Sequence, residues 1–233
     1  MKKQSKQSGF VSCIGAAGGS STRMGRNKLF LEIGGIPVIA RTLLALNESD
    51  FIDEIIVSAR EEDMLAIGDL AKQFCIQKLK AIVKGGAERS ESVKAAISQV
   101  SDSCTLIAVH DGARPLIDAD TIADVVQNAE TFGAAACGVR PKATLKRENK
   151  DGFIAQTVDR SEVYEIQTPQ VFEKALFLRA YDAEEDVLKG ATDDCGLVER
   201  LGAKIKITQG TYRNIKITTI EDVVIAECLL EEN

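Results

Sequence analysis

The sequence predicts an α/β protein with a Rossmann-like, mostly parallel sheet, flanking helices and a protruding β-hairpin arm. Two observations predict this fold. Apolar runs typical of buried strands alternate with amphipathic helical patterns as far as residue 139, and this alternation indicates parallel strands joined by crossover helices. Residues 142–160 then alternate polar and apolar side chains around Asp151-Gly152, which is a hairpin signature.

The first part of the chain supplies most of the expected sheet. A strand begins at Phe10, and Pro37 stands in the opening turn of the first helix, where a missing N–H does no harm. Apolar spacing of two or of three to four residues then predicts, in order, a helix at 37–46, a strand at 52–59, a helix at 64–74, a strand at 80–83, a helix at 93–100, a strand at 105–109, a helix at 122–129 closed by Gly133, and a strand at 134–139.

After the hairpin the core resumes at Val163. We expect a helix from about residue 174, a short helix after 192–194 that ends at Gly202, and strands at 204–208 and 214–217. Thr218 and Glu221 have capping-box spacing and open the final helix. We expect a disordered tail at 1–9 and one domain at 10–233, in which 140–161 forms a dimerisation arm.

Composition excludes several classes of protein. The chain has 233 residues, a hydrophobic content of 45% and no apolar run of membrane-spanning length. Its net charge of −6 argues against nucleic-acid binding, which needs a basic face. Six scattered cysteines form no C-x-x-C pair, and four lie in apolar stretches. They predict buried thiols in a reducing cytoplasm rather than a disulfide framework or zinc site.

Residues 10–28 contain a candidate phosphate-binding loop. The first apolar run breaks at Gly18-Gly19 and leads to three cations, Arg23, Arg26 and Lys28. Small residues let the backbone approach a ligand, and free N–H groups form a donor surface for an anion. The segment matches neither G-x-x-x-x-G-K-[ST] nor G-x-G-x-x-G. We interpret it as a nucleoside triphosphate loop of another kind, the alternative being a simple turn.

Other unusual residues also follow predicted strands, at 85–86 and 110–115. Ligands bind at the carboxyl ends of the strands in an open α/β sheet, so these residues should converge on one edge. Asp111 would emerge there, where a carboxylate suits Mg²⁺ held against triphosphate oxygens. The alternative is a loop cap or an ion pair with Arg114. His110, the sole histidine, is more typical of a hydrogen-bonded structural residue than of a catalyst.

Four more residues have two readings each. Arg89 and Ser92 open a helix and are either a plain N-terminal turn or contacts for a ribose or base. Arg160 and Lys216 stand where the arm and a strand end, and each is either a ligand contact or a solvated cation.

Taken together, these motifs closely resemble the 2-C-methyl-D-erythritol 4-phosphate cytidylyltransferase family of the non-mevalonate isoprenoid pathway. The wider nucleotidyltransferase family shares G-x-G-T-R followed by Lys, and here Ser21 replaces the second Gly with another small residue. The resemblance spans nearly the whole chain after residue 9. It rests on A-G-G-S-S-T-R-M-G with N-K (17–28), G-G-A-E-R-S-E-S-V (85–93), V-H-D-G-A-R-P (109–115), T-V-D-R (157–160), T-P-Q (168–170) and N-I-K-I-T (214–218).

The resemblance implies a fold of the nucleotidyltransferase type and an enzyme that joins CTP to methylerythritol 4-phosphate, with Mg²⁺, and releases pyrophosphate. It implies that Arg23 and Lys28 are catalytic and steady the triphosphate, and that Asp111 approaches the metal. The cytidine would contact Ala17, Gly18, Gly19, Gly86 and Ser92. The methylerythritol phosphate would contact Arg114, Thr144, Arg160, Thr168 and Lys216. In the family the arm reaches across a homodimer, so Thr144 and Arg160 would serve the neighbouring subunit's site.

Three other functions remain open from the sequence. Ribitol-5-phosphate cytidylyltransferase is a relative with the same nucleotide loop and a different alcohol. Pyrophosphorylases that use UTP or GTP with a sugar phosphate fit the T-V-D-R and N-I-K-I-T motifs less well. A nucleotide-binding regulatory protein without catalysis is disfavoured by the joint presence of Arg23, Lys28, Asp111, Arg160 and Lys216.

Overall fold

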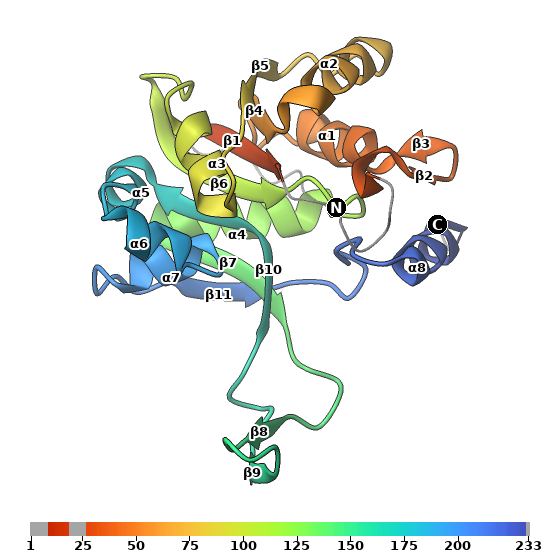
Figure 1. Cartoon of the computed structure of the whole chain (residues 1–233). Helices are drawn as coiled ribbons and strands as arrows, with labels where there is room; N and C mark the ends of the chain where they lie inside the picture. The colour runs from red at the N-terminus through yellow and green to blue at the C-terminus, as the bar shows by residue number, and fades with distance from the viewer. Residues whose placement is uncertain (1–8, 19–26, 232–233) are drawn as a thin grey trace.

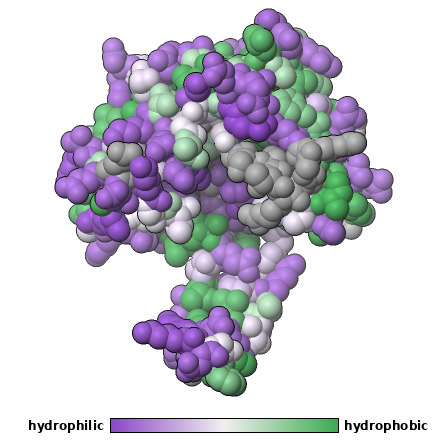
Figure 2. Space-filling view, in the orientation of Figure 1, coloured by the Kyte–Doolittle hydropathy of each residue, from purple (hydrophilic) through white to green (hydrophobic). Residues whose placement is uncertain are grey.

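The computed structural model of the chain describes residues 9–18 and 27–231. The predicted tail at 1–9 therefore lies, apart from Gly9, outside the described residues. Figure 1 shows a layered body with helices on both faces of a twisted sheet, and a thin arm that projects from one side. Figure 2 shows the same arm as a stalk beneath a mostly hydrophilic face of the body.

One sheet of seven strands forms the centre of the body. All its neighbouring strands run parallel, except that β10 is antiparallel to both β6 and β7. The predicted fold class, a mostly parallel α/β sheet, is therefore confirmed. In spatial order the strands are β11 (Lys206–Gln209), β7 (Ala134–Val139), β10 (Glu165–Glu173), β6 (Cys104–Asp111), β1 (Phe10–Ala17), β4 (Glu54–Ala59) and β5 (Leu79–Lys84).

The two faces of this sheet bury separate hydrophobic clusters, because alternate strand residues point to opposite faces. In β1, Val11 and Cys13 belong to one cluster and Ile14 to the other. The first cluster is covered by α1 (Val38–Glu48), α2 (Met64–Gln73), α4 (Ala119–Phe132) and α8 (Ile220–Glu231). The second is covered by α3 (Arg89–Ile97), α5 (Lys174–Tyr181), α6 (Glu185–Lys189) and α7 (Asp194–Glu199).

Local signals fix the ends of α4. The Asp118 side chain accepts a hydrogen bond from the backbone N–H of Thr121, which satisfies a free donor of the first turn. Gly133 ends the helix at φ +82°, a left-handed conformation that favours glycine. The predicted C-cap at Gly133 is confirmed, and it turns the chain directly into β7.

Four short elements connect the larger ones along the amino-terminal half. The helical turn η1 (Lys28–Phe30) comes after β1 in the chain, and a two-stranded hairpin leads from it into α1. The remaining bounds are β2 (Glu32–Ile33), β3 (Ile36–Pro37) and η2 (Glu61–Asp63).

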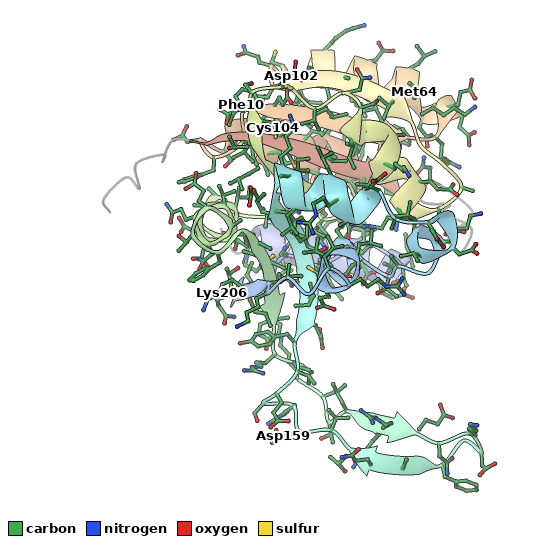
Figure 3. All side chains as sticks on the ribbon, turned by 90° about the vertical axis from the view of Figure 1, so that its left-hand side faces the viewer. Phe10, Met64, Asp102, Cys104, Asp159 and Lys206 are labelled. Carbon is green, nitrogen blue, oxygen red and sulfur yellow. The ribbon has the colours of Figure 1, made fainter. Side chains whose placement is uncertain are left out.

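The arm is an antiparallel pair, β8 (Lys146–Glu148) and β9 (Ile154–Thr157), at the predicted position. The Asn149 side chain shapes its turn by accepting hydrogen bonds from the N–H groups of Asp151 and Phe153. All residues of both strands are exposed, and Figure 3 shows the pair extending away from the sheet, beyond Asp159. The hairpin strands therefore pack against no hydrophobic core in the described part of this chain.

One predicted strand is absent, one cap prediction was wrong, and the strand β10 was missed. The strand β10 was not predicted, because the hydrophobic alternation of E-I-Q-T-P-Q-V-F-E is broken by polar residues that are nevertheless buried. Residues 214–217 form no strand, because Asn214 and Ile217 bond to loops and to β10 rather than to a ladder. The cap before α8 uses Asp222, not Glu221: its carboxylate accepts from the N–H and hydroxyl of Thr218.

All six cysteines are free, and Cys13, Cys104, Cys137 and Cys195 are buried. This agrees with the prediction from their apolar surroundings. Within the described ranges, no helix combines the length and apolar character needed to cross a lipid bilayer.

Candidate active site

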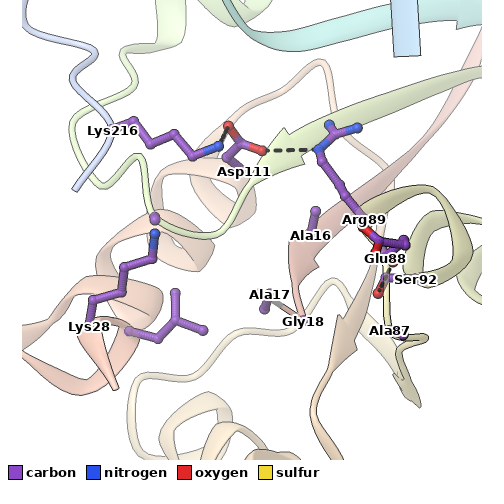
Figure 4. A pocket seen from close by; sticks show the side chains of 12 residues that line it. Ala16, Ala17, Gly18, Lys28, Ala87, Glu88, Arg89, Ser92, Asp111 and Lys216 are labelled. Atoms are coloured by element: carbon purple, nitrogen blue, oxygen red, sulfur yellow. Dashed lines mark hydrogen bonds and ion pairs between the residues drawn. The ribbon is translucent and has the colours of Figure 1, made fainter. Parts of the chain in front are cut away.

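A pocket of about 230 Å³ lies at the carboxyl ends of β1 and β6. Ala16, Ala17 and Gly18 line it from the end of β1, and Asp111 lines it from the end of β6. Side chains from three other segments complete it: Lys28 of η1, Arg89 and Ser92 of α3, and Lys216 of the segment before α8. Figure 4 shows Lys28 reaching toward the pocket from the side opposite Arg89.

Asp111 stands among three cations. Its carboxylate lies 2.9 Å from Lys216 Nζ, 3.4 Å from Arg114 Nε and 3.5 Å from Arg89 Nε. Two of these interactions are the dashed lines of Figure 4. Burial alone would raise the pKa of the Asp111 carboxyl, but the charges of Lys216, Arg89 and Arg114 hold it well below its usual range. The site therefore keeps a carboxylate ionised at neutral pH.

Arg89 is fixed from its other side by a second carboxylate. Arg89 Nη2 lies 2.7 Å from Asp194 Oδ2, and Asp194 is fully buried. Tyr181 donates its hydroxyl to the same carboxylate. Burial would lower the pKa of Arg89, but Asp194 and Asp111 raise it instead, while burial and Asp194 raise the pKa of Tyr181. Arg89 is therefore a charged, immobilised wall of the pocket.

Close backbone contacts surround Ser92. A Cβ atom added at Gly18 would lie 2.8 Å from Ser92 Oγ, and one added at Gly85 would lie 2.7 Å from it. The Ser92 hydroxyl donates to the Glu88 carbonyl at 3.0 Å and accepts from the N–H of Gly86 at 3.1 Å. Glycine at 18 and 85 thus lets β1 and the loop after β5 pack directly against α3, and this contact shapes one wall of the pocket.

A hydrogen-bond chain through Thr168 and His110 fixes the backbone of Asp111. The Asp111 N–H donates to Thr168 Oγ1 at 3.0 Å, and the Thr168 hydroxyl donates to His110 Nδ1 at 3.1 Å. His110 Nε2 carries the proton, because it faces the Arg114 carbonyl at 3.3 Å and a carbonyl only accepts. Burial is the main cause that lowers the pKa of His110 to about 4. His110 is therefore a neutral, hydrogen-bonded structural residue at pH 7.

The structure brings part of the predicted site together. Six of the residues proposed from the sequence line the pocket: Ala17, Gly18, Lys28, Ser92, Asp111 and Lys216. Three others adjoin it through hydrogen bonds or ion pairs to lining residues without lining it themselves: Gly86, Arg114 and Thr168.

The remaining proposed residues lie elsewhere. Thr144 is exposed in the connection to the arm, and Arg160 at the other end of the arm donates to the Lys142 carbonyl at 3.0 Å. Neither lines the pocket of its own chain. Gly19 and Arg23 fall outside the described residues, so their predicted roles stay predictions.

Three charged residues of the site lie outside the set of contacts that the family resemblance implies. Glu88 lines the pocket, and so does Arg89, for which the sequence leaves a plain helix turn and a contact to a ribose or base both open. Asp194, the partner of Arg89, lies 105 positions away along the chain. The sequence offered only the T-D-D helix start as a signal there, and that pattern more commonly marks a cap; Asp193 does cap α7.

Comparisons with known proteins identify the family of this chain. The family model described as 2-C-methyl-D-erythritol 4-phosphate cytidylyltransferase matches residues 10–232. A protein of that name from Caldanaerobacter subterraneus is 45% identical, over 95% of this chain and 99% of its own, and one from Clostridium acetobutylicum is 40% identical, over 94% and 96%. The crystal structure of 4-diphosphocytidyl-2C-methyl-D-erythritol synthase from Anaerococcus prevotii superimposes with a TM-score of 0.85 at 31% identity and covers 96% of both chains. The chain therefore belongs to the 2-C-methyl-D-erythritol 4-phosphate cytidylyltransferase family of nucleotidyltransferases.

Proposed function

We propose that this chain transfers the cytidylyl group of CTP to 2-C-methyl-D-erythritol 4-phosphate, giving 4-diphosphocytidyl-2-C-methyl-D-erythritol and pyrophosphate. The observation that carries the proposal is the ionised Asp111 at the base of a pocket walled by Lys28, Arg89 and Lys216. Two polyanionic substrates require such a concentration of fixed positive charge. Family membership supports the identity of the alcohol, and the ribitol 5-phosphate alternative is not favoured by the relatives' names.

The pocket residues divide between the two substrates. We assign the narrow wall of Ala17, Gly18 and Ser92 to the cytidine, with Gly86 beside it, because glycines let the backbone approach a ring closely. Lys28 then meets the triphosphate, as Arg23 is expected to do, while Gly19 is expected to contact the cytidine. Lys216 meets the phosphate of the methylerythritol phosphate, since its side chain is 40% exposed and lies on the opposite side of Asp111 from Arg89.

The proposed reaction needs no general base. The attacking oxygen belongs to a phosphate monoester, whose second pKa is about 6, so it is already an anion at neutral pH. It forms a bond to the α-phosphorus while the bond from the α-phosphorus to the bridging oxygen breaks, and pyrophosphate leaves with that electron pair. Lys28 and Lys216 orient the two anions and offset the charge that develops. The buried neutral His110 takes no part.

The donor set of the pocket fits Mg²⁺. In the part of the chain that the structure describes, no three His, Cys, Asp or Glu residues form a metal cage. Mg²⁺ needs no such cage, because it binds through one or two carboxylates, waters and substrate phosphates. Asp111 is such a carboxylate. Bound Mg²⁺ would supply charge stabilisation for the phosphates.

The arm is the basis for a homodimer in this proposal. Thr144 and Arg160 lie on the arm and not at the pocket of their own chain, and Phe153 and Ile154 leave large apolar side chains 70% and 69% exposed there. We therefore assign Thr144 and Arg160 to the site of a second copy, while Arg114 and Thr168 support the site from within the chain. Four buried free thiols support a cytoplasmic location.

A pyrophosphate-release assay tests this function. Each of CTP, UTP, ATP and GTP is combined with methylerythritol 4-phosphate, ribitol 5-phosphate or glycerol 3-phosphate, with and without Mg²⁺. We expect turnover with CTP and methylerythritol 4-phosphate, at least about 10²-fold above any other pair, because a site built to hydrogen-bond its substrate rejects analogues strongly. Preference for ribitol 5-phosphate, or CTP binding without turnover for any alcohol, would contradict the proposal.

A further inference from the structure

Lys216 lies on a segment without regular secondary structure, between β11 and α8. A long lysine side chain on such a segment has many conformations open to it. Its ammonium is nevertheless held 2.9 Å from Asp111. Something on the same segment must therefore fix the backbone that carries it.

Asn214 makes the contacts that can do so. Its side chain is fully buried, and Nδ2 donates to the Thr168 carbonyl at 2.8 Å. Its own carbonyl accepts from Arg114 Nη1 at 2.7 Å. Asn214 is thus joined on one side to β10 and on the other to the loop that follows β6.

A second anchor stands on the other side of Lys216. The Ile217 N–H donates to the Ala113 carbonyl at 2.8 Å, and its side chain is fully buried in the core. Lys216 therefore lies between two fixed points, Asn214 and Ile217, and only its side chain is free to extend. Removing either point would release the backbone over several residues.

Asn214 and Asp111 are both hydrogen-bonded to the same residue, Thr168. Thr168 accepts the Asn214 amide with its carbonyl and accepts the Asp111 N–H with its hydroxyl. One residue of β10 thus sets the positions of both members of the Lys216–Asp111 pair. Asn214 Oδ1, in contrast, is buried and has no hydrogen-bond partner among the residues that the structure describes. An unpartnered buried oxygen is costly. The bonds that Nδ2 donates, to the Thr168 carbonyl at 2.8 Å and to Gln167 Oε1 at 3.4 Å, are therefore the contacts that account for an asparagine here.

We infer that Asn214 is a positioning residue for the proposed transfer reaction and acts through Lys216. It fixes the Lys216 backbone in the position from which the ammonium can contact the phosphate of the alcohol substrate. This inference rests on the substrate-binding role proposed for Lys216. Asn214 itself contacts no substrate in this scheme, because it is fully buried and does not line the pocket.

A double-mutant cycle tests the inference. The four proteins are wild type, Asn214→Ala, Lys216→Ala and the double variant, each assayed at saturating CTP over a range of methylerythritol 4-phosphate. Asn214→Ala should lower kcat/KM for the alcohol phosphate by about 10–10²-fold, the scale of a displacement of about 1 Å, with the KM for CTP changed less than about threefold. In the Lys216→Ala background the same substitution should have no further effect, because its target is gone.

Each outcome has one meaning. If Lys216→Ala leaves the kinetics unchanged, the proposed role of Lys216 fails, and with it the basis of the inference. If Lys216→Ala lowers kcat/KM but the Asn214→Ala effect is absent or simply multiplies with it, Asn214 does not act through Lys216. Should Asn214→Ala fail to fold, Asn214→Ser leaves a smaller cavity and is read in the same cycle.

A matched control separates positioning from stability. Thr208, on β11, is also buried, and its Oγ1 has no hydrogen-bond partner within the described part of the chain, but it lies outside the pocket. Thr208→Ala should change the melting temperature and leave both KM values and kcat at wild-type levels. A kinetic loss in Thr208→Ala as large as that in Asn214→Ala would show that general destabilisation explains both and would overturn the inference.

Discussion

Single polar residues in this protein owe their states to partners far away in the sequence. Asp111 is the clearest case at the site: it is held ionised by cations from α3, from its own loop and from the segment before α8. Removing one of these cations leaves two, so the carboxylate should stay charged. Removing Asp111 instead would bring three like charges together without compensation.

Glu54 is a second such residue, at the opposite end of the sheet. Its carboxylate accepts hydrogen bonds from Ser12 at 2.6 Å and from the Ser101 N–H at 2.8 Å and hydroxyl at 2.6 Å. Lys80 Nζ lies 3.1 Å away. Burial alone would raise the pKa of Glu54, but these partners lower it below its usual value.

The pKa of Glu54 has a consequence for acid stability. Because its folded pKa lies below the unfolded value of about 4.3, ionised Glu54 stabilises the fold above that pH, and the contribution is lost as the pH falls through the folded pKa. Glu54→Gln keeps the shape and removes the charge, so it should cost about 1–3 kcal/mol at pH 7. Its unfolding free energy should fall less steeply than that of wild type below about pH 4.5. Denaturant titrations at several pH values measure this, and parallel pH slopes for the two proteins would refute it.

The end of β1 packs closely against α3. The contact depends on Gly18, because an added Cβ would lie 2.8 Å from the buried Ser92 Oγ. Neighbouring main chain and a buried side chain have little room to shift at such a junction. The same junction forms the wall that we assign to the cytidine.

We expect Gly18→Ala to raise the KM for CTP by about tenfold or more, since overpacking of about 1–3 kcal/mol falls directly on that wall. Gly68→Ala is the matched control: it lies in α2, and its added Cβ would meet only Ile82 at an ordinary 3.6 Å. That variant should keep wild-type KM values and gain up to about 1 kcal/mol from helix propensity. Steady-state kinetics measure the KM values, and thermal melts measure the stability of both variants. An unchanged KM for CTP in Gly18→Ala would count against the assignment of this wall to the cytidine.

Element predictions succeeded where packing follows periodicity and failed where it follows hydrogen bonds. The helix α4 buries its apolar residues at helical spacing and ends at Gly133, as predicted. The strand β10 buries Gln167, Thr168 and Gln170, and such polar residues give no strand pattern. They are buried because their partners are present: Gln170 Oε1, for example, accepts from the N–H groups of Asp194 and Cys195.

At the level of the whole molecule, the arm projects from the body and leaves every residue of its two strands exposed. Arg140 and Lys142 at its base stack on the rings of Tyr164 and Tyr212, and the Tyr212 hydroxyl donates to the Arg140 carbonyl at 2.7 Å. These contacts tie the arm's root to the segment that also carries Lys216. The arm is therefore held in one direction at its base.

Subunit complementation tests whether the arm serves a second copy. The Lys216→Ala and Arg160→Ala proteins should each be poorly active by themselves. Co-expressed in equal amounts, they should regain about a quarter of wild-type specific activity, because that share of sites combines a native pocket with a native arm from the partner. A mixture no more active than its components, with heterodimers verified by differently tagged subunits, would show that each arm serves its own chain or neither.

Sequence patterns were sufficient to predict the α/β class, the hairpin, the end of α4 at Gly133 and the family, because apolar periodicity, turn residues and local motifs act over a few positions. They also pointed to six of the residues that line the pocket, since residues after parallel strands meet at one edge of a sheet. The charge network became visible only in the folded structure. Asp111 pairs with Lys216, and Arg89 pairs with Asp194. In each pair the two residues are 105 positions apart along the chain. Ion pairs and buried hydrogen bonds depend on distances in space, which no local pattern encodes.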